Sequence, residues 1–249
     1  MADIWRDWTY AEYCRVPLEN LFVLDERHLT GELGLKISQL NYAASMLVPY
    51  GGLRDVDLKA GETVIIAPAT GQFGAAAVFM ALAMGAKVVA FGRSTSALAD
   101  LKARMPYAER LTTVPITGEM VRDLVALKKA ASGSADAFFD IGPSEAEGST
   151  HFKSAILALG RSGRVSLMGG YSSDIPIPHR FIMRFDIKLQ GKWMCERSDI
   201  KDFFKMVEAG LVDLNVCRVV GEYGLEDFKE AWNVAAENAR FGQQVVMVP

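Results

Sequence analysis

A turn between a short β-branched run and an alanine-rich stretch offers the clearest chemistry in this sequence. The run Val64–Ile66 leads into residues 67–74, APATGQFG, where proline and glycine interrupt any continuous helix. In a doubly wound sheet, the first turn of this kind binds the pyrophosphate of a dinucleotide on the free amides and positive dipole end of the next helix. Gly71 would let the backbone approach phosphate, and Gly74 would let the helix pack closely on the strand.

The glycine pattern of this turn is incomplete, because Pro68 and Thr70 stand where glycines often occur. Taken alone, a plain strand–helix connection explains the turn as well as a cofactor site does. Its place at the first such turn of a sustained α/β pattern favours the cofactor site.

The end of the next expected strand, Phe91-Gly92-Arg93-Ser94, indicates which dinucleotide is preferred. A site for NAD(H) places an Asp or Glu on the ribose hydroxyl, about 20 residues after the last glycine. Here no acid is present, whereas the guanidinium of Arg93 and the hydroxyl of Ser94 can bind a 2′-phosphate. NADP(H) is therefore favoured over NAD(H), with an ordinary solvated Arg93 as the alternative.

These residues need a sheet to position them, and the chain alternates strand and helix patterns through its centre. Strands are expected at 64–66, 87–91, 110–114, 137–141 and 164–168, and helices at 73–84, 96–104, 120–131 and 152–159. A further strand is expected at 188–193, followed by helices at 199–209 and 225–239 and a strand at 244–248. Such alternation predicts an α/β fold, a doubly wound parallel sheet covered on both faces.

Composition and charge exclude several other classes of protein. The 249 residues carry 27 Lys+Arg against 30 Asp+Glu and are 50% hydrophobic, which is typical of a globular chain and not of a nucleic-acid binder. The segment from Val64 to Ala86 has no charge and is long enough to span a bilayer, but its proline and glycines favour strand, turn and helix. The first residues lack the apolar core of a secretory signal, so a cytoplasmic location is expected.

Metal chemistry has little support in the sequence. The three cysteines lie far apart without a CxxC spacing, and the three histidines, His28, His151 and His179, are isolated from one another. We expect each histidine to lie on the surface or in a loop, and we expect no catalytic metal.

Short matches in order along nearly the whole chain resemble the medium-chain dehydrogenases/reductases, and most closely their zinc-free quinone-reductase-like branch. The matching stretches are 9–13 with 16–17, 48–53, 59–64, 69–74, 84–89, 139–140, 163–165, 168–170 and 242–246. Their order and spacing carry the resemblance, since no single one is decisive.

The resemblance implies a division of the chain into three parts. Residues 1–57 would be a remnant of a GroES-like substrate domain, 58–197 the dinucleotide-binding Rossmann domain, and 198–249 a segment that returns toward the substrate domain. The fold would then combine the doubly wound sheet with a truncated β-rich domain formed by the two chain ends. Most of the family's N-terminal domain, which carries zinc ligands or much of the substrate pocket, is missing here.

The resemblance also assigns roles to residues around the cofactor. The pyrophosphate would be held by the turn Thr70, Gly71, Gln72, Phe73 and Gly74, and the 2′-phosphate by Arg93 and Ser94. Ile141 and Gly142 would lie near the ribose, and Met168, Gly169 and Gly170 near the nicotinamide. Tyr50 is a candidate proton donor, because a phenol can donate to a developing oxyanion. It can equally be an aromatic residue that only fills a seam.

Two functions remain open at this point. The first is an NADP(H)-dependent, zinc-independent oxidoreductase that transfers hydride to a carbonyl or activated alkene of a small molecule. The alternative is a catalytically inactive NADP(H)-binding protein, a cofactor sensor or assembly subunit, that has lost its substrate pocket. A homodimer through the expected edge strand, Ile187–Met194, is predicted in either case, although its lysines can also protect the edge from pairing. A mainly structural dimer is a third possibility, and neither nucleic acid nor membrane is expected as a partner.

Overall fold

The computed structural model describes residues 11–248, so Thr9 and Tyr10 of the resembling stretches lie outside the described residues. The chain forms two compact units, one from Ser45 to Asp199 and one that unites the two chain ends, Met1–Ala44 and Ile200–Pro249. The expected division into a substrate-domain remnant, a dinucleotide-binding domain and a returning segment, with boundaries at 57/58 and 197/198, stays a prediction.

The larger unit is built on a six-stranded, wholly parallel sheet in the order β3-β2-β1-β4-β5-β6. Its strands are β1 (Thr63–Ala67), β2 (Lys87–Gly92), β3 (Leu111–Pro115), β4 (Ala135–Asp140), β5 (Leu159–Leu167) and β6 (Lys188–Gly191). This order is that of a doubly wound dinucleotide-binding sheet, and it confirms the predicted fold class.

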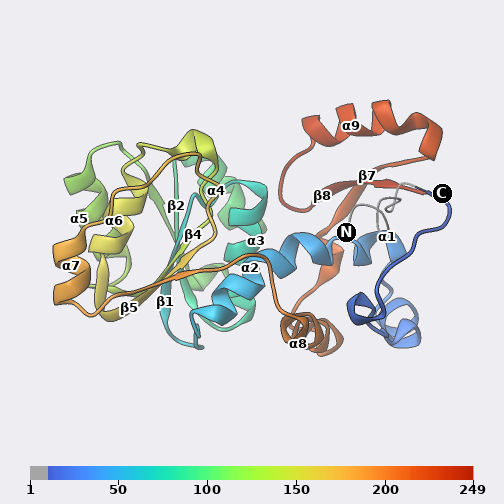
Figure 1. Ribbon diagram of the computed structural model, residues 1–249, viewed down its shortest axis with the longest axis horizontal. Coiled ribbons are helices and arrows are strands. Elements are labelled where there is room, and N and C mark those ends of the chain that lie inside the picture. Colours follow the sequence, from blue (N-terminus) through green and yellow to red (C-terminus); the bar gives the residue numbers. More distant parts are fainter. Residues whose placement is uncertain (1–10, 249) are drawn as a thin grey trace. The chain divides into compact units, whose positions relative to one another are not determined.

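Helices cover both faces of this sheet, as right-handed crossovers require. They are α3 (Gln72–Ala83), α4 (Thr95–Arg104), α5 (Met120–Ala130), α6 (His151–Leu157) and α7 (His179–Arg184). Figure 1 shows α3 and α4 on one side of the sheet and α5, α6 and α7 on the other. Because both faces are covered, the central strands are mainly apolar, as in the Ile65 and Phe138 pair across β1 and β4, both wholly buried.

The strand order reverses between β1 and β4. At the carboxyl ends of both strands the chain leaves the sheet. Ile66 pairs with Phe139 and Ala67 with Asp140 at this edge. After β1 the chain goes to one face of the sheet, and after β4 it goes to the other, so a crevice is left between the two connections. Ligands of open α/β sheets bind at such a switch point.

Besides α7, the helix α2 (Ala43–Asp55) of this unit was not predicted from the sequence, and α2 contains Pro49. It packs against the sheet through glycine, because a Cβ on Gly52 would meet the side chains of Met168 and Phe139. Its end is fixed by polar contacts, since the Gln190 side chain donates to the Asp55 carbonyl at 3.3 Å. The helix thus belongs to the larger unit by its contacts.

The smaller unit joins segments that are distant in the sequence. A two-stranded parallel sheet of β7 (Arg218–Tyr223) and β8 (Gln243–Met247) is bridged by α9 (Phe228–Glu237). The N-terminal part contributes short helical turns at Leu18–Asn20 and Arg27–Glu32 and the helix α1 (Ile37–Leu40). The helix α8 (Arg197–Glu208) begins in the larger unit and continues into this one. β7 was not predicted, whereas the expected strand at 244–248 is confirmed.

A buried aromatic contact ties the two chain ends of this unit together. The rings of Tyr42 and Phe241 meet edge to face at 6.1 Å, and the Tyr42 hydroxyl accepts a hydrogen bond from the Gly242 amide at 2.7 Å. Across residues 11–248, no helix combines the length and apolar character needed to traverse a bilayer.

Candidate functional site

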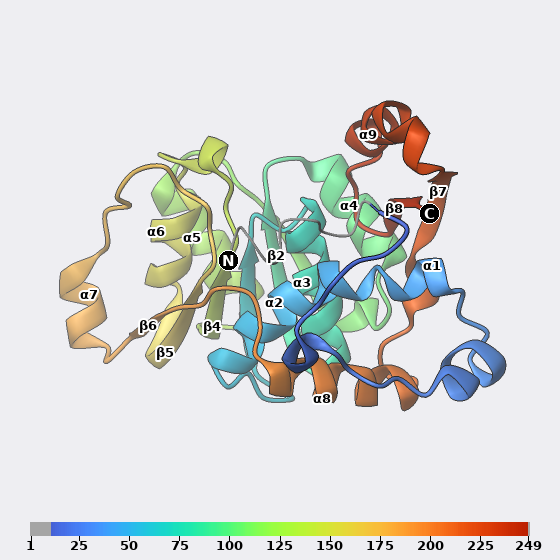
Figure 2. The same ribbon diagram turned by 45° about the vertical axis from the view of Figure 1, so that its right-hand side comes forward.

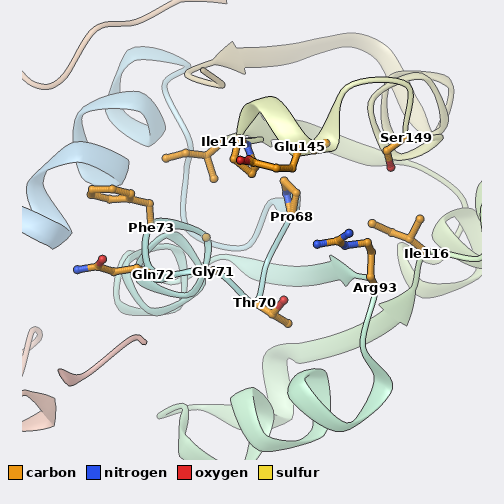
Figure 3. Close-up of a pocket in the computed structure, with 13 residues that line it drawn as sticks. Pro68, Thr70, Gly71, Gln72, Phe73, Arg93, Ile116, Ile141, Glu145 and Ser149 are labelled. Atoms are coloured by element: carbon orange, nitrogen blue, oxygen red, sulfur yellow. The ribbon is translucent and has the colours of Figure 1, made fainter. Parts of the chain in front are cut away.

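A cavity of about 370 Å³ opens at the carboxyl ends of the strands, at the switch point. Four connections line it: the turn after β1, Arg93 after β2, Ile116 after β3 and the loop after β4 (Figure 3). The predicted residues Thr70, Gly71, Gln72, Phe73, Gly74, Arg93 and Ile141 are all among its lining. The structure therefore brings these predicted residues together around one cavity, and their role in binding phosphate stays a prediction.

The amino end of α3 presents free donors to this cavity. Gly71 is the N-cap residue and has no side chain to cap the helix. The amides of Gln72, Phe73 and Gly74 donate to no backbone or side-chain acceptor among the described residues. Unpaired amides at the positive end of a twelve-residue helix form a binding site for an anion.

The two glycines of the turn differ in the space around them. A Cβ on Gly71 would meet no atom within 4 Å, so this position is open. A Cβ on Gly74 would collide with the Pro68 carbonyl oxygen and the Ala69 backbone. Gly74 therefore allows the helix to begin directly against the turn, while Gly71 leaves room for a ligand. Gln72 is held by a hydrogen bond from its side-chain amide to the Ser45 hydroxyl at 3.2 Å.

Arg93 brings a positive charge to the opposite side of the cavity. Its side chain extends from the end of β2 toward Pro68, between Thr70 and Ile116 (Figure 3). The side chain is exposed, and no ion pair with an acidic residue is formed by it within residues 11–248. A guanidinium without an acidic partner, a short reach from the helix amides, is suited to a phosphate.

Ser94, the other residue predicted at the 2′-phosphate, caps α4. Its hydroxyl oxygen accepts from the Ala97 amide at 3.2 Å and lies 3.0 Å from the Ser96 hydroxyl. It is not among the residues that line the cavity. While its oxygen caps the helix, the hydroxyl of Ser94 still has one hydrogen to donate. A role of Ser94 in binding the 2′-phosphate therefore stays a prediction.

The loop after β4 forms the remaining wall, and sequence reasoning missed most of it. Across all the connections, six lining residues were not predicted as site residues: Pro68, Ile116, Pro143, Glu145, Ala146 and Ser149. All follow the ends of β1, β3 or β4, so the rule that ligands bind beyond the carboxyl ends of strands could have found them. Glu145 extends toward Ile141 and away from Arg93 (Figure 3), which leaves the guanidinium side of the cavity without a carboxylate.

The residues predicted near the ribose and nicotinamide, Gly142 and the loop 168–170, meet at the ends of β4 and β5. The Met168 amide donates to the Asp140 carbonyl at 3.0 Å, and the Gly170 amide donates to the Gly142 carbonyl at 2.8 Å. None of them lines the cavity. A Cβ on either Gly142 or Gly169 would collide with the ring of Tyr171, which covers both glycines.

Tyr171 belongs to a buried polar cluster that the sequence did not reveal. Its hydroxyl donates to the Asp140 carboxylate at 2.7 Å, and His151 Nε2 lies 3.1 Å from the same hydroxyl. Burial and the adjacent Asp140 charge raise the pKa of Tyr171 well above its ordinary value. The phenol therefore stays protonated and acts as a donor to the carboxylate.

The expectation that His151 is a surface or loop histidine is wrong. It is the first residue of α6 and is 1% exposed, as is Asp140, and the two side chains approach to 3.5 Å. The sequence did not predict this cluster, because its three residues come from β4, α6 and the loop after β5. His28 and His179 show no such burial.

The candidate proton donor, Tyr50, lies in α2 and is 2% exposed. The Arg54 guanidinium lies over its ring, 5.7 Å from the centroid. It does not line the cavity of the phosphate turn. This burial agrees with the packing alternative, and a catalytic role stays a prediction.

Metal ligands were sought among the same residues. Within the part of the chain that the structure describes, no three His, Cys, Asp or Glu side chains gather so that they could hold a metal ion.

The family model of the zinc-binding dehydrogenases matches residues 73–209, more than half of the chain. The chain belongs to this family. It is thereby a medium-chain dehydrogenase/reductase, as the sequence resemblance predicted. The family's name implies zinc, but the described residues offer no group of three ligands that fits the metal.

Individual relatives are more distant. The L-threonine 3-dehydrogenase of Vibrio parahaemolyticus is 24% identical over 92% of this chain and 62% of its own length. An NAD-dependent alcohol dehydrogenase has a similar structure, with a TM-score of 0.68, 22% identity, and coverage of 95% of this chain and 65% of its own. A mycobacterial protein solved with NADPH gives a TM-score of 0.69, 20% identity, and coverage of 96% and 71%. The chain thus spans less than two thirds of the threonine dehydrogenase, and the two solved structures share its fold.

Proposed function

We propose that this chain is an NADP(H)-dependent oxidoreductase that transfers hydride to a carbonyl or activated alkene of a small molecule without zinc. The proposal is carried by one observation: the free amides of α3 and the Arg93 guanidinium face the same cavity. A carboxylate at the end of β2 would repel a 2′-phosphate, and an arginine stands there instead. Relatives of this fold include both an NAD-dependent and an NADPH-bound protein, so the fold alone does not select the cofactor.

The residues of the chain would act by binding and orientation. The first-turn amides of α3 would hold the pyrophosphate, Arg93 would neutralise the 2′-phosphate, and Ile116 and Ile141 would supply apolar contact. The nicotinamide supplies the hydride when bound, and the protein then contributes alignment and exclusion of water. Tyr50 stays the candidate proton donor, although it does not line this cavity.

The first experiment is a fluorescence titration of the protein with NADPH and with NADH, repeated for Arg93→Ala. A charged hydrogen bond to phosphate contributes about 1.5–3 kcal/mol, so NADPH binding should weaken roughly 10- to 100-fold. NADH binding should hardly change. Arg122→Ala removes an exposed arginine of α5 and serves as the matched control. Equal weakening of both nucleotides, or none, would overturn the NADP(H) assignment.

The alternative, an NADP(H)-binding protein without redox catalysis, is favoured by a different observation. Tyr171 covers Gly142 and Gly169, where the resemblance puts the ribose and nicotinamide. Oxidation of NADPH on a panel of quinones, enones and aldehydes distinguishes the two functions. Sustained turnover above the rate without protein excludes the inactive binder, and saturable binding without turnover excludes the oxidoreductase.

We also propose that two copies pair through the edge strand, in a protein of the cytoplasm whose substrate is a small molecule. β6 ends the sheet on one side, and the residues after it, Trp193 and Met194, are exposed to 88% and 46%. An exposed strand edge flanked by apolar side chains favours pairing with another edge. Light scattering over a range of protein concentrations tests this, and a monomer at every concentration refutes it.

A further inference from the structure

Two further cavities lie on the face of the sheet that α5, α6 and α7 cover, and they share a wall. The first, of about 270 Å³, is lined mainly by apolar side chains, among them Met120, Phe152, Ile175 and Pro176. The second, of about 420 Å³, lies over α7. Lys153 of α6 lines both, so the two cavities adjoin. Figures 1 and 2 show α7 on the far side of the larger unit from α3 and α4, away from the phosphate turn.

The cavity over α7 gathers positive charge that the protein does not neutralise. Lys153, Arg180 and Arg184 line it, together with His179. Among the described residues, these two arginines and this lysine form no ion pair with an acid. Three other cations, Arg161, Arg164 and Lys192, all pair with acids. The nearest acids in the chain, Asp174 and Asp186, line neither cavity, and Asp186 pairs with Arg161. Unpaired cations around one hollow attract an anion.

The apolar cavity next to it carries one unsatisfied polar atom. His151 lines this cavity and is 1% exposed, and its Nδ1 has no hydrogen-bond partner among the residues described. Because Nδ1 is enclosed by the protein, the surface that this cavity presents is mainly that of apolar side chains such as Phe152, Ile175 and Pro176. The cavity over α7 has an aromatic part of its own, where the rings of Phe181 and Phe185 stack at 4.3 Å.

We propose that these adjoining cavities form a binding site for an amphipathic phosphate, a molecule with a dianionic head and a short apolar body. Arg180, Arg184 and Lys153 bind the head, and the cavity of Phe152 and Ile175 takes the body. The charge of the head group is inferred from the three cations, because together they suit a phosphate dianion better than a single carboxylate. The apolar cavity also adjoins the cavity at the turn after β1, since Ala146 and Ser149 line both, whereas Arg180 and Arg184 line only the cavity over α7.

The test is isothermal titration of the full chain with octyl phosphate below its micellar concentration, with inorganic phosphate and octanol titrated alongside. Octyl phosphate should bind saturably and at least tenfold more tightly than either part alone, because only it engages both cavities. Equal binding of inorganic phosphate shows that the apolar body is not recognised and overturns the proposal. Binding to vesicles of anionic phospholipid without binding of monomeric octyl phosphate overturns it in favour of a membrane surface.

Variants with matched charge separate this site from general attraction of anions. Arg180→Gln/Arg184→Gln should weaken octyl phosphate binding roughly tenfold or more, and should leave NADPH binding unchanged. The control is Lys128→Gln/Lys129→Gln, which removes two exposed charges from α5. Both double variants should keep the wild-type circular dichroism, since all four side chains are exposed. Equal loss in the two double variants assigns the binding to net charge and refutes the site.

Discussion

Gly71 and Gly74 stand three residues apart at the start of α3, yet only Gly71 has room for a side chain. The same substitution at both positions therefore separates binding from stability. In Gly71→Ser the new side chain enters open space and can cap the helix, occupying amides that would otherwise meet phosphate. We expect unfolding in urea to be unchanged or slightly later, and NADPH binding to weaken at least fivefold.

Gly74→Ser is expected to lower the stability of the protein, so that it unfolds at a lower urea concentration than the wild type. Its Cβ collides with the Pro68 carbonyl and the Ala69 backbone, which cannot move as a flexible side chain can. Overpacking of this kind costs about 1–3 kcal/mol. Unfolding followed by circular dichroism measures the loss. If Gly74→Ser were as stable as Gly71→Ser, the tight packing of α3 on its turn would be refuted.

A second prediction at the residue scale concerns the buried cluster of Asp140, His151 and Tyr171. Tyr171→Phe keeps the ring contact with Phe152 but removes the donor to Asp140. The buried carboxylate would then retain only His151, at 3.5 Å. Leaving a buried polar group short of a partner costs about 1–3 kcal/mol, so the urea midpoint should fall. Tyr107→Phe, at an exposed tyrosine, is the control and should unfold like the wild type.

At the scale of elements, the sequence predicted those whose apolar pattern is locally complete. The central strands and α3 were predicted because a strand buried on both faces is an unbroken apolar run that ends at a glycine or proline. α2 escaped because Pro49, Gly51 and Gly52 have low helix propensity, and packing against Met168 and Phe139 overrides that propensity. β7 was not predicted because Gly221 interrupts its short apolar run and none of its residues is fully buried.

The same distinction governs the candidate site. Arg93 and the residues of the phosphate turn follow directly from the ends of β1 and β2, so the local sequence pointed to them. The wall supplied by Glu145 and Ser149, and the cluster of Asp140, His151 and Tyr171, depend on which strands become neighbours. Local pattern carries no information on that pairing, and the order of β4 between β1 and β5 had to be seen in the structure.

At the scale of the molecule, the two chain ends form one unit, and a histidine connects them. His28 Nε2 lies 3.1 Å from the Glu208 carbonyl at the end of α8, and Nδ1 lies 2.8 Å from the Glu32 carboxylate. Both partners are acceptors, so only the imidazolium can donate to both. The Glu208 carbonyl, and after it Glu32, raise the pKa of His28 above its ordinary value.

A pH dependence of this unit follows from that pKa. Folding raises the proton affinity of His28, so its contribution to stability is complete below the ordinary histidine pKa of about 6.5. That contribution is lost as the pH rises through the folded value. The amides of β7 and β8 should therefore become less protected from hydrogen exchange as the pH rises above about 6.5, after correction for intrinsic exchange rates.

The variant His28→Gln isolates this effect, because glutamine can still donate to the Glu208 carbonyl but does not titrate. Protection of β7 and β8 in the variant should lose its dependence on pH over this range. Amides of β1 and β4, in the other unit, provide the internal reference and should respond to neither pH nor substitution. If the variant kept the wild-type pH profile, the link between the chain ends would not depend on the charge of His28, and the raised pKa would have no part in holding this unit together.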